Sequence, residues 1–252
     1  MKFSIITPTH VSTPYFYDLY KSIEAQTEKN WEWVIYLNGG ALKVVDEIAN
    51  NPKVKIYKDD WQPTWTQPLH KDIKIGNIKN KAFFKGKGDI LVEADHDDLL
   101  TPNCLAELKK AFTKGIGFCY SDTAYIGLTK PLSADYGWQS YEYEHQGEKL
   151  IVMCAFEPSP KMIQSMWFSP NHVRAWRKDV YHKLGGHDKT LRVCDDLDLM
   201  IRTYSATKLK RISLPLYIYR IDGNNTFIKN AYEIQQTTRA LQHKYREILC
   251  IK

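Results

Sequence analysis

Short apolar segments alternate with helix-start signals through the first half of this chain. Phe3–Thr7 has strand character, and the Ser12-Thr13-Pro14 segment after it supplies a capping residue and a proline suited to the first helical position. The same order recurs at Trp33–Leu37 and Ala41–Asn50, and strand character returns at Val54–Tyr57. Strands that alternate with helices predict an α/β protein with a mostly parallel sheet and right-handed crossovers.

Ligands of open parallel sheets bind beyond the carboxyl ends of the strands. Three loops should therefore converge on one crevice, namely Thr7–His10, Asn38 and Asp95–Asp98. The alternation continues after a loop at Trp61–Pro68. Its further elements are a lysine-rich helix at about His70–Lys85, a strand at Ile90–Val92, a helix at Asn103–Thr113 and a strand at Ile116–Ser121.

Three carboxylates, Asp95, Asp97 and Asp98, directly follow the strand at Ile90–Val92, and Thr101-Pro102 then signals a helix start. Carboxylates this close raise one another's pKa values unless a cation lies among them. Oxygen ligands suit Mg²⁺ or Mn²⁺, which complete their coordination with water and substrate phosphates. The segment therefore predicts a nucleoside-diphosphate substrate. The alternative is an acidic turn that caps the following helix.

The overall composition is that of a globular protein, because 43% of the residues are hydrophobic and 25% are charged. A chain of 252 residues can form one large α/β domain or two small ones. The net charge of +6 is modest. Its densest basic stretch, Lys71–Lys87, suits either an anionic substrate or a solvated helix face.

Cysteine usage and hydropathy favour a cytoplasmic location. The five cysteines are odd in number and show no C-x-x-C spacing, so we expect reduced, mostly buried thiols. No hydrophobic stretch approaches the roughly 18 residues of a membrane span. Met1-Lys2-Phe3-Ser4 leads directly into a strand without a secretory segment. We therefore expect a soluble, cytoplasmic protein without a transmembrane segment.

The stretch Lys130–Pro170 is rich in aromatic residues and has no clean period, so we expect it to be partly irregular and folded over the crevice. Taken singly, its aromatic side chains are typical of a core. Together they can form a platform for a sugar. The segment Asn230–Ile251 carries apolar residues at helical spacing, which predicts a C-terminal helix docked against the domain.

Four sequence blocks resemble those of the family 2 nucleotide-sugar glycosyltransferases, which have the GT-A fold. The blocks are Ser4-Ile5-Ile6-Thr7-Pro8-Thr9, Lys79-Asn80-Lys81-Ala82, Asp95–Pro102, and Gly185-Gly186-His187-Asp188 followed by Asp195–Arg202. The last two are specific when found together, whereas the first is weak alone. The resemblance implies a Rossmann-like GT-A domain over residues 1–228, with helices on both faces of a mostly parallel sheet and an acceptor-side extension. Its nucleotide-binding half is expected at 1–122, its acceptor-binding half at 123–228, and a C-terminal helix at 229–252.

The resemblance also implies a set of donor-binding residues. They are Thr7, Pro8 and Thr9 at the end of the first strand, Asn38 at the base, Lys79 near phosphate or nucleotide, and Asp95 and His96 in the acidic segment. Relatives often have aspartate at the position of Asn38 and arginine at the position of Lys79, which leaves the base preference open. Lys79 can equally be a surface lysine.

The metal ligands implied by the resemblance are Asp97 and Asp95, joined by Asp222 where relatives often have histidine. A carboxylate can replace imidazole as a ligand for a hard ion. Arg220, two residues before Asp222, is expected to meet phosphate. The alternative for the Asp222-Gly223 pair is a tight turn without any ligand.

Asp196 stands at the family's general-base position, and Asp195 precedes it. Adjacent acids favour a raised pKa in one of them, although an Asp pair is also a common helix cap. Gly186 is expected to permit close backbone approach near the acceptor. Trp176 and Arg177 are expected to border the acceptor pocket, with a core position as the alternative for Trp176.

These inferences predict a metal-dependent, inverting glycosyltransferase that uses Mn²⁺ or Mg²⁺ to move a sugar from a nucleoside-diphosphate sugar, with a UDP-sugar favoured, to an acceptor hydroxyl. The acceptor is a glycan, a lipid-linked sugar, a protein or, with less support, a nucleic acid. One alternative is a metal-dependent nucleotidyl or phosphodiester transferase. Another is a non-catalytic carbohydrate-binding protein that uses Trp138, Trp167 and Trp176.

Overall fold

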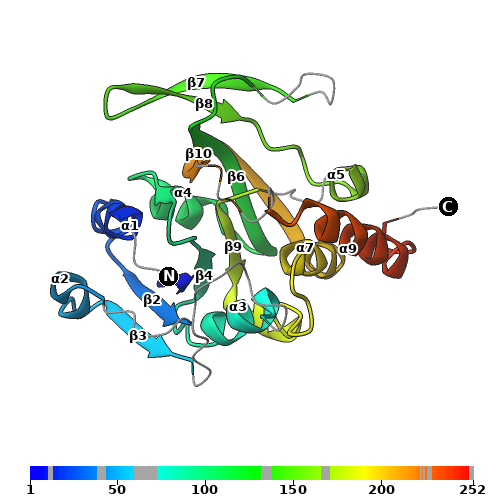
Figure 1. Ribbon diagram of the computed structural model, residues 1–252, viewed down its shortest axis with the longest axis horizontal. Coiled ribbons are helices and arrows are strands. Elements are labelled where there is room, and N and C mark those ends of the chain that lie inside the picture. The colour runs from blue at the N-terminus through cyan, green and yellow to red at the C-terminus, as the bar shows by residue number, and fades with distance from the viewer. Residues whose placement is uncertain are drawn as a thin grey trace.

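A curled, mostly parallel sheet runs through the centre of the molecule (Figure 1). The computed structural model describes residues 1–10, 14–38, 44–59, 73–131, 138–165, 171–221, 223, 225 and 229–249. The strands are β1 (Phe3–Thr9), β2 (Trp31–Leu37), β3 (Val54–Lys58), β4 (Ile90–Glu93), β5 (Leu99–Leu100), β6 (Ile116–Ile126), β7 (Ser140–His145), β8 (Glu148–Met153), β9 (Arg174–Arg177) and β10 (Lys208–Arg220). Their order in the main path is β3-β2-β1-β4-β9-β6-β10-β5.

Strand direction brings most carboxyl ends to one edge of the sheet. β3, β2, β1 and β4 are parallel to one another, and β10 is parallel to β6. β9 is antiparallel to both β4 and β6, so those two strands run the same way. The short β5 is antiparallel to β10. The α/β fold expected from the alternation of strands and helices is therefore confirmed, and the inserted β9 is a feature that the alternation did not predict.

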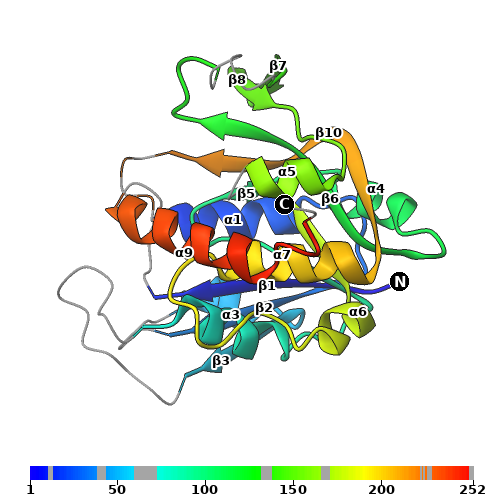
Figure 2. The ribbon, with the colours of Figure 1, turned by 90° about the vertical axis from the view of Figure 1, so that its right-hand side faces the viewer.

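Helices cover both faces of this sheet (Figures 1 and 2). They are α1 (Pro14–Glu24), α2 (Asp46–Ala49), α3 (Ile75–Phe83), α4 (Cys104–Ala111), α5 (Pro160–Ser165), α6 (Lys178–Lys183), α7 (Asp195–Ala206) and α9 (Ala231–Lys244). Alternate strand residues face opposite sides, so Phe3 and Ile5 pack with α1 and α4, whereas Ile6 packs with α3 and α7. Burial of two apolar faces explains why the strands read as nearly continuous hydrophobic runs.

The predicted strands of the first half are all present, with ends that differ by at most five residues. β6 is the longest extension, because it runs on to Ile126 instead of ending at Ser121. The boundary expected after residue 122 lies inside this strand, so the two predicted halves share it. The lysine-rich helix is shorter than expected, since α3 begins at Ile75. Residues 41–43 and 61–72 lie outside the described residues, and they include the start of the helix predicted at about His70. α2 covers only the later part of the helix predicted at Ala41–Asn50.

The stretch Lys130–Pro170, expected to be partly irregular, contains a regular hairpin in its central part. β7 and β8 form an antiparallel hairpin, and Gln146 and Gly147 make its turn with positive φ values of 52° and 84°. β7 is largely exposed and alternates polar residues with tyrosines, so it lacks the apolar run that marks the buried strands. Pairing of β8 with β6 adds the hairpin to the sheet, and Figure 2 shows it projecting from one end of the molecule.

The C-terminal helix docks as expected. α9 packs against α7 in an apolar cluster that also contains Leu249. No helix in the described part of the chain is long and apolar enough to cross a membrane.

Candidate functional site

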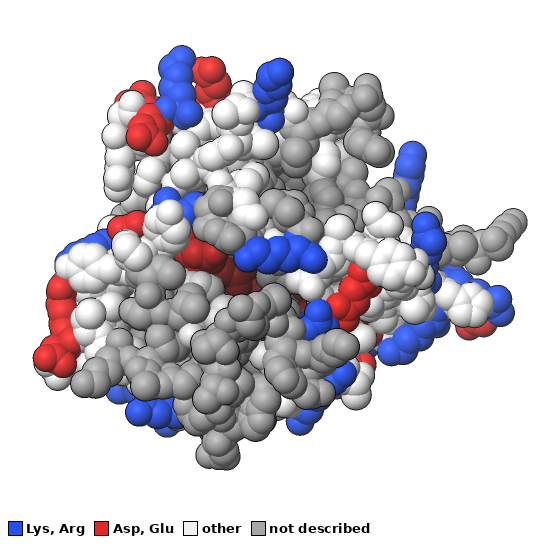
Figure 3. All heavy atoms as spheres, viewed as in Figure 1, with Lys and Arg blue, Asp and Glu red and all other residues white. Residues whose placement is uncertain are grey.

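The carboxyl ends of β1, β2 and β4 meet at one edge of the sheet, which we term the carboxyl edge (Thr7–His10, Asn38 and Asp95–Asp98). The Asn38 backbone amide donates a hydrogen bond to the Thr9 carbonyl at 3.0 Å. The rings of His10 and His96 are 5.6 Å apart, edge to face. The three loops therefore come together as the sequence predicted. Figure 3 shows acidic side chains at the floor of a recess on this side of the molecule.

The residues at the ends of β1 and β2 are mostly buried. Thr7 accepts a hydrogen bond from Trp33 Nε1 at 2.9 Å, so its hydroxyl already helps to hold the sheet. Thr9 is buried and Pro8 is partly exposed. Asn38 Oδ1 is buried, and among the described residues it has no hydrogen-bond partner. A buried amide oxygen of this kind is costly unless water or a ligand donates to it.

The acidic turn after β4 divides into exposed and buried carboxylates. Asp95, His96 and Asp97 are partly exposed, whereas Asp98 is buried. Asp98 accepts hydrogen bonds from the Tyr217 hydroxyl at 2.9 Å and from the Arg220 backbone amide at 2.7 Å. Burial, together with Asp97 and Asp95, raises the pKa of Asp98 well above its usual range. Asp98 therefore ties β10 to the turn, whereas Asp95 and Asp97 remain partly exposed.

Arg220 closes the turn from the other side. Its Nε donates to the Asp97 carbonyl at 3.0 Å, and its guanidinium lies 4.0 Å from the centroid of the Tyr15 ring. The side chain is 14% exposed. Arg220 is thus fixed beside the acidic turn, in reach of an anion in the recess. Asp222, the third predicted metal ligand, lies outside the described residues.

A buried network of charges lies beneath the recess. Glu93, at the end of β4, is fully buried and pairs with Lys79 Nζ at 2.5 Å and with Arg174 Nε at 3.3 Å. Arg174 also donates from Nη1 to Asp196 Oδ2 at 2.9 Å. Burial alone would raise the pKa of Glu93, but Arg174 and Lys79 hold it well below its usual range. Lys79, whose side chain is 14% exposed, is therefore a mostly buried member of this network and not a surface lysine.

Glu93, Asp95 and His172 bring potential metal-ligand atoms within 4.8 Å of one another. Two of these residues are already engaged by cations. Lys79 and Arg174 compensate Glu93, and Arg174 Nη2 lies 3.0 Å from His172 Nε2, where the permanently protonated guanidinium must be the donor. The Asp95 side chain is 32% exposed, so it remains accessible to a ligand. The oxygen donors that fit a hard divalent ion are therefore those of Asp95 and the neighbouring, partly exposed Asp97.

Asp195 and Asp196 begin α7, after Cys194 in the left-handed conformation (φ 59°). Their side chains differ in exposure, 5% for Asp195 and 22% for Asp196. Burial raises the pKa of Asp195 to about 7. Burial also opposes ionisation of Asp196, but Arg174 and Lys79 outweigh it and lower the pKa. Asp196 is thus the accessible, ionised carboxylate of the pair, and the raised pKa expected in one of them falls on Asp195.

A glycine turn lies behind this pair. Gly186 has φ +70°, and a Cβ there would come within 2.7 Å of the Tyr181 ring and 2.8 Å of Asn80 Nδ2. Asn80 donates to the carbonyls of Gly185 at 2.7 Å and His187 at 2.8 Å. The second and fourth sequence blocks therefore meet here. Glycine at 186 permits the packing of α3 and α6, which is a different close approach from the acceptor contact that was expected.

Trp176 takes the core position that was the alternative from the sequence, and Arg177 lies away from the carboxyl edge. Trp176 is fully buried and donates from Nε1 to Thr203 Oγ1 at 3.1 Å, so it has no surface to offer an acceptor. Arg177 pairs with Ile90 at the start of β4, at the end of that strand opposite the carboxyl edge. Its guanidinium donates to main-chain carbonyls around the end of α4, those of Phe112, Thr113 and Ile116. Both residues serve the core and its edges.

Several residues of the site were not predicted from the sequence. They are Glu93, His172, Arg174 and Tyr217. The signal for two of them was present, because Glu93 and Arg174 stand within apolar strand segments, and charged residues are almost never fully buried unless they are paired. The partner of each could not be read from the sequence, since the residues that pair lie far apart along the chain.

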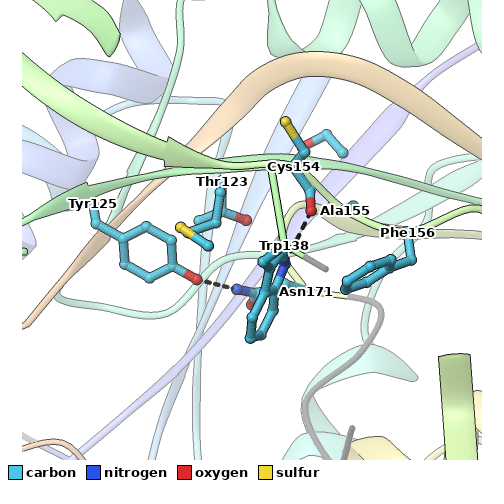
Figure 4. A pocket seen from close by; sticks show the side chains of 9 residues that line it. Thr123, Tyr125, Trp138, Cys154, Ala155, Phe156 and Asn171 are labelled. Carbon is cyan, nitrogen blue, oxygen red and sulfur yellow. Dashed lines mark hydrogen bonds between the residues drawn. The ribbon is translucent and has the colours of Figure 1, made fainter. Parts of the chain in front are cut away.

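A small cavity between β6, β8 and residue 171 is lined by aromatic side chains (Figure 4). Its polar groups are satisfied within the protein, as Asn171 Nδ2 donates to the Tyr125 hydroxyl and Trp138 Nε1 donates to the Cys154 carbonyl. The cavity measures about 10 Å³, which is room for about one water molecule. Trp138 and Phe156 thus pack together here, whereas Trp167 lies outside the described residues.

Comparison with known proteins identifies relatives of this chain. Residues 4–169 match the family described as Glycosyl transferase family 2. The chain is 23% identical over 221 residues to the uncharacterized glycosyltransferase YwdF of Bacillus subtilis (strain 168), a match that covers 87% of this chain and 74% of the relative. It is 23% identical over 234 residues to the chondroitin synthase of Pasteurella multocida (strain Pm70), covering 90% of this chain and 21% of that protein.

Solved structures share the fold. The structure of S. aureus TarS 1–349 superposes with a TM-score of 0.69 at 14% identity, covering 99% of this chain and 69% of that one. The same protein in complex with UDP-GlcNAc gives a TM-score of 0.67. The mannosyltransferase PcManGT from Pyrobaculum calidifontis, in complex with GDP-Man and Mn²⁺, gives 0.60 at 12% identity, covering 98% of this chain and 68% of that one.

Proposed function

The chain belongs to glycosyl transferase family 2, and from that premise we propose that it moves a sugar from a nucleoside-diphosphate sugar to an acceptor hydroxyl in one inverting displacement. The observation that carries the proposal is the pairing of two kinds of carboxylate around one recess. Asp95 and Asp97 are partly exposed at the carboxyl edge, and Asp196 is held ionised by Arg174. The first kind suits a cation beside a diphosphate, and the second suits proton removal from an alcohol.

The donor nucleotide binds, in this proposal, across Thr7, Pro8, Thr9 and Asn38. The unsatisfied Asn38 Oδ1 accepts a hydrogen bond from a base N–H, which both uracil and guanine carry. A UDP-sugar is the favoured donor, since a structural neighbour is solved with UDP and with UDP-GlcNAc. GDP-Man in PcManGT is the competing precedent.

Lys79 and His96 both remain in the proposal, Lys79 through its ion pair with Glu93 and His96 as the neighbour of His10. Lys79 gives its charge to Glu93 and so acts on the site through that residue. His96 is partly exposed beside His10, where burial, with a further contribution from His96, lowers the pKa of His10 to about 4. A neutral His10 leaves the positive charge near the diphosphate to the metal and Arg220.

Mn²⁺ or Mg²⁺ is the proposed cofactor, held by Asp95 and Asp97, with Asp222 as a further candidate. When bound, such an ion acts as a Lewis acid on the departing diphosphate. The protein residues prepare its place. Tyr217 accepts a hydrogen bond from the Asp95 backbone amide at 3.0 Å, and Arg220 binds the Asp97 carbonyl, so both ends of the turn are fixed.

Asp196 is the proposed general base. Its Oδ2 accepts from Arg174, and its Oδ1 accepts from the Leu197 backbone amide at 2.8 Å, so the carboxylate is oriented at both oxygens. A partly exposed oxygen can still take the proton of an acceptor hydroxyl as that oxygen attacks the anomeric carbon. Burial raises the pKa of the neighbouring Asp195 to about 7. The proposed role of Asp195 is to shape the electrostatic surroundings of Asp196. The acceptor class proposed is a glycan, lipid-linked sugar or protein, with nucleic acid the least supported.

A donor screen tests this proposal. The protein is incubated with UDP, GDP and their sugars, with and without Mn²⁺, and its thermal stability is recorded, because a ligand of the native state raises apparent stability. We expect a nucleotide-dependent rise that requires the metal, followed by release of a nucleoside diphosphate on addition of acceptor sugars. Stabilisation by metal-free glycans alone, or release of pyrophosphate in place of the diphosphate, contradicts the proposal.

A further inference from the structure

The C-terminal helix α9 lies beside α7 (Figures 1 and 2). Residues at the start and at the end of α9 contact the segment that carries the aspartate pair. We call residues 192–202 the aspartate segment. At the start of α9, Arg192 Nε donates to both carboxylate oxygens of Glu233, at 2.8 and 2.9 Å, and Arg192 Nη2 donates to Asn230 Oδ1 at 3.1 Å. This first contact lies three residues before Asp195.

The second contact lies at the other end of α9 and centres on Asp198, a fully buried carboxylate in the first turn of α7. Asp198 Oδ1 accepts a hydrogen bond from the Tyr245 hydroxyl at 2.6 Å and lies 3.4 Å from Lys244 Nζ. Asp198 Oδ2 accepts from Arg202 Nε at 2.8 Å. A buried charge with both oxygens engaged is held in one position, because any rotation leaves an oxygen unpaired.

Arg202 extends this network to the glycine turn. Its Nη1 donates to the Leu184 carbonyl and its Nη2 to the Gly186 carbonyl, both at 2.8 Å. The guanidinium therefore joins the glycine turn to Asp198, and Asp198 joins α7 to Tyr245. Three elements that are separate in sequence are connected two residues after Asp196.

Between these two polar contacts, α9 and the aspartate segment pack through apolar side chains. Cys194, Leu197 and Ile201 of the aspartate segment share a cluster with Ile234 and Leu241 of α9. Cys194 Sγ lies 3.6 Å from the Ile234 carbonyl. Because Cys194 is in the left-handed conformation, which is strained for a side chain other than glycine, the surrounding contacts must hold it.

We propose that Tyr245 and Asp198 are positioning residues, through which α9 fixes the first turn of α7 so that Asp196 faces the acceptor hydroxyl. The inference rests on the function proposed above and deepens it, because it assigns the C-terminal helix to the machinery of proton removal. In this proposal Tyr245 acts on Asp196 through its hydrogen bond to Asp198. Donor binding at the carboxyl edge does not depend on it.

The test is the Tyr245→Phe variant, which removes one hydroxyl and keeps the ring. Tyr232→Phe is the matched control, since Tyr232 lies in the first turn of α9, which Tyr245 directly follows, and is 77% exposed. We expect kcat to fall roughly ten- to a hundredfold in Tyr245→Phe, because small displacements of a reacting group have effects of this size. KM for the donor and the affinity for UDP with Mn²⁺ should stay within about twofold of wild type, as small rotations of α7 leave the carboxyl edge intact. The Tyr232→Phe variant should match wild type in all three.

A second readout does not need turnover. Hydrogen exchange of the amides in residues 193–199 should become faster in Tyr245→Phe, with exchange in β1 unchanged, if Tyr245 holds this segment. Glu233→Gln weakens the contact at the other end of α9 and should give the same pattern to a smaller degree, with the exposed Glu247→Gln as its control.

Each outcome bears on the inference. A kcat equal to that of Tyr232→Phe, unchanged exchange at 193–199, or an equal loss of donor affinity and kcat contradicts positioning by Tyr245. Absence of transfer by the wild-type protein with any nucleotide sugar contradicts the proposed function instead, and the exchange experiment then decides whether α9 holds the aspartate segment.

Discussion

The carboxyl edge and the aspartate segment are built in different ways. The carboxyl edge follows from the register of adjacent parallel strands, so Thr9, Asn38 and Asp95 meet through neighbouring backbone. The aspartate segment is held by buried charges from several elements, Arg174 on one side and Arg202 on the other. Where sheet register positions a site, an exposed side chain can be substituted without loss of the fold. Where buried ion pairs position it, substitution of one partner lowers both the activity and the free energy of unfolding.

The largest effect expected from this difference concerns Asp196. Asp196→Asn should lower the transfer rate by roughly 100- to 10,000-fold, because a positioned base is lost. Binding of UDP with Mn²⁺, measured by calorimetry, should persist, since the carboxyl edge is separate. Asp179→Asn is the control, as Asp179 occupies the same second position in α6 and is exposed. A normal rate in folded Asp196→Asn removes the base assignment.

Arg174 should show the coupling of the aspartate segment to stability. Arg174→Met leaves Glu93 and Asp196 without their shared cation, which should cost about 3–5 kcal/mol of unfolding free energy in denaturant titrations at pH 7. Both carboxyls have folded pKa values below their usual range, so they stabilise the protein above their unfolded pKa and that contribution is lost as pH falls through the folded pKa.

The deficit of Arg174→Met should accordingly shrink in acid. Arg239→Met, on the exposed face of α9, is the control and should lose little at any pH. A pH-independent deficit would show that Arg174 acts by packing alone.

The carboxyl edge should behave in the opposite way. Asp97→Asn should weaken Mn²⁺-dependent binding of UDP roughly ten- to a hundredfold, the range known for residues that support a bound metal. The melting temperature without ligand should stay at the wild-type value, because Asp97 is partly exposed. The exposed Asp46→Asn serves as control. A large loss of stability in Asp97→Asn would break the distinction between the two regions.

Asp195 offers a pH test of the same distinction. Burial raises its pKa to about 7. A carboxyl with a raised folded pKa gives stability that is fully present below its unfolded pKa and is lost as pH rises through the folded value. Asp195→Asn, which resembles the neutral acid, should therefore raise the free energy of unfolding at pH 8, by an amount on the order of 1.4 kcal/mol for each pH unit between the folded and unfolded pKa values. The gain should be smaller at pH 5, and equal gains at both pH values contradict the shift.

The smallest expected effect is at Asn38. Asn38→Ala should weaken UDP binding about fivefold, the value of one hydrogen bond near 1 kcal/mol. Binding of pyrophosphate with Mn²⁺ should not change, since it carries no base. Equal losses for UDP and pyrophosphate would place Asn38 away from the base.

Local sequence patterns determined the order of strands and helices, the acidic turn after β4 and the glycine turn before α7. Each depends on residues close together in the chain, such as the apolar run at Ile90–Val92 or the left-handed backbone at Gly186. The short polar strand β7 escaped prediction because only one of its faces is packed, which leaves too few apolar residues to mark it.

Only the tertiary structure decided which charged groups became partners. Insertion of β9 between β4 and β6 carried Arg174 beside Glu93 and Asp196, buried Trp176, and took Arg177 away from the recess. Docking of α9 likewise brought Tyr245 to Asp198 across 47 residues of sequence. Propensity and periodicity act over a few residues, whereas the pairing of buried charges depends on topology, and no local pattern carries that information.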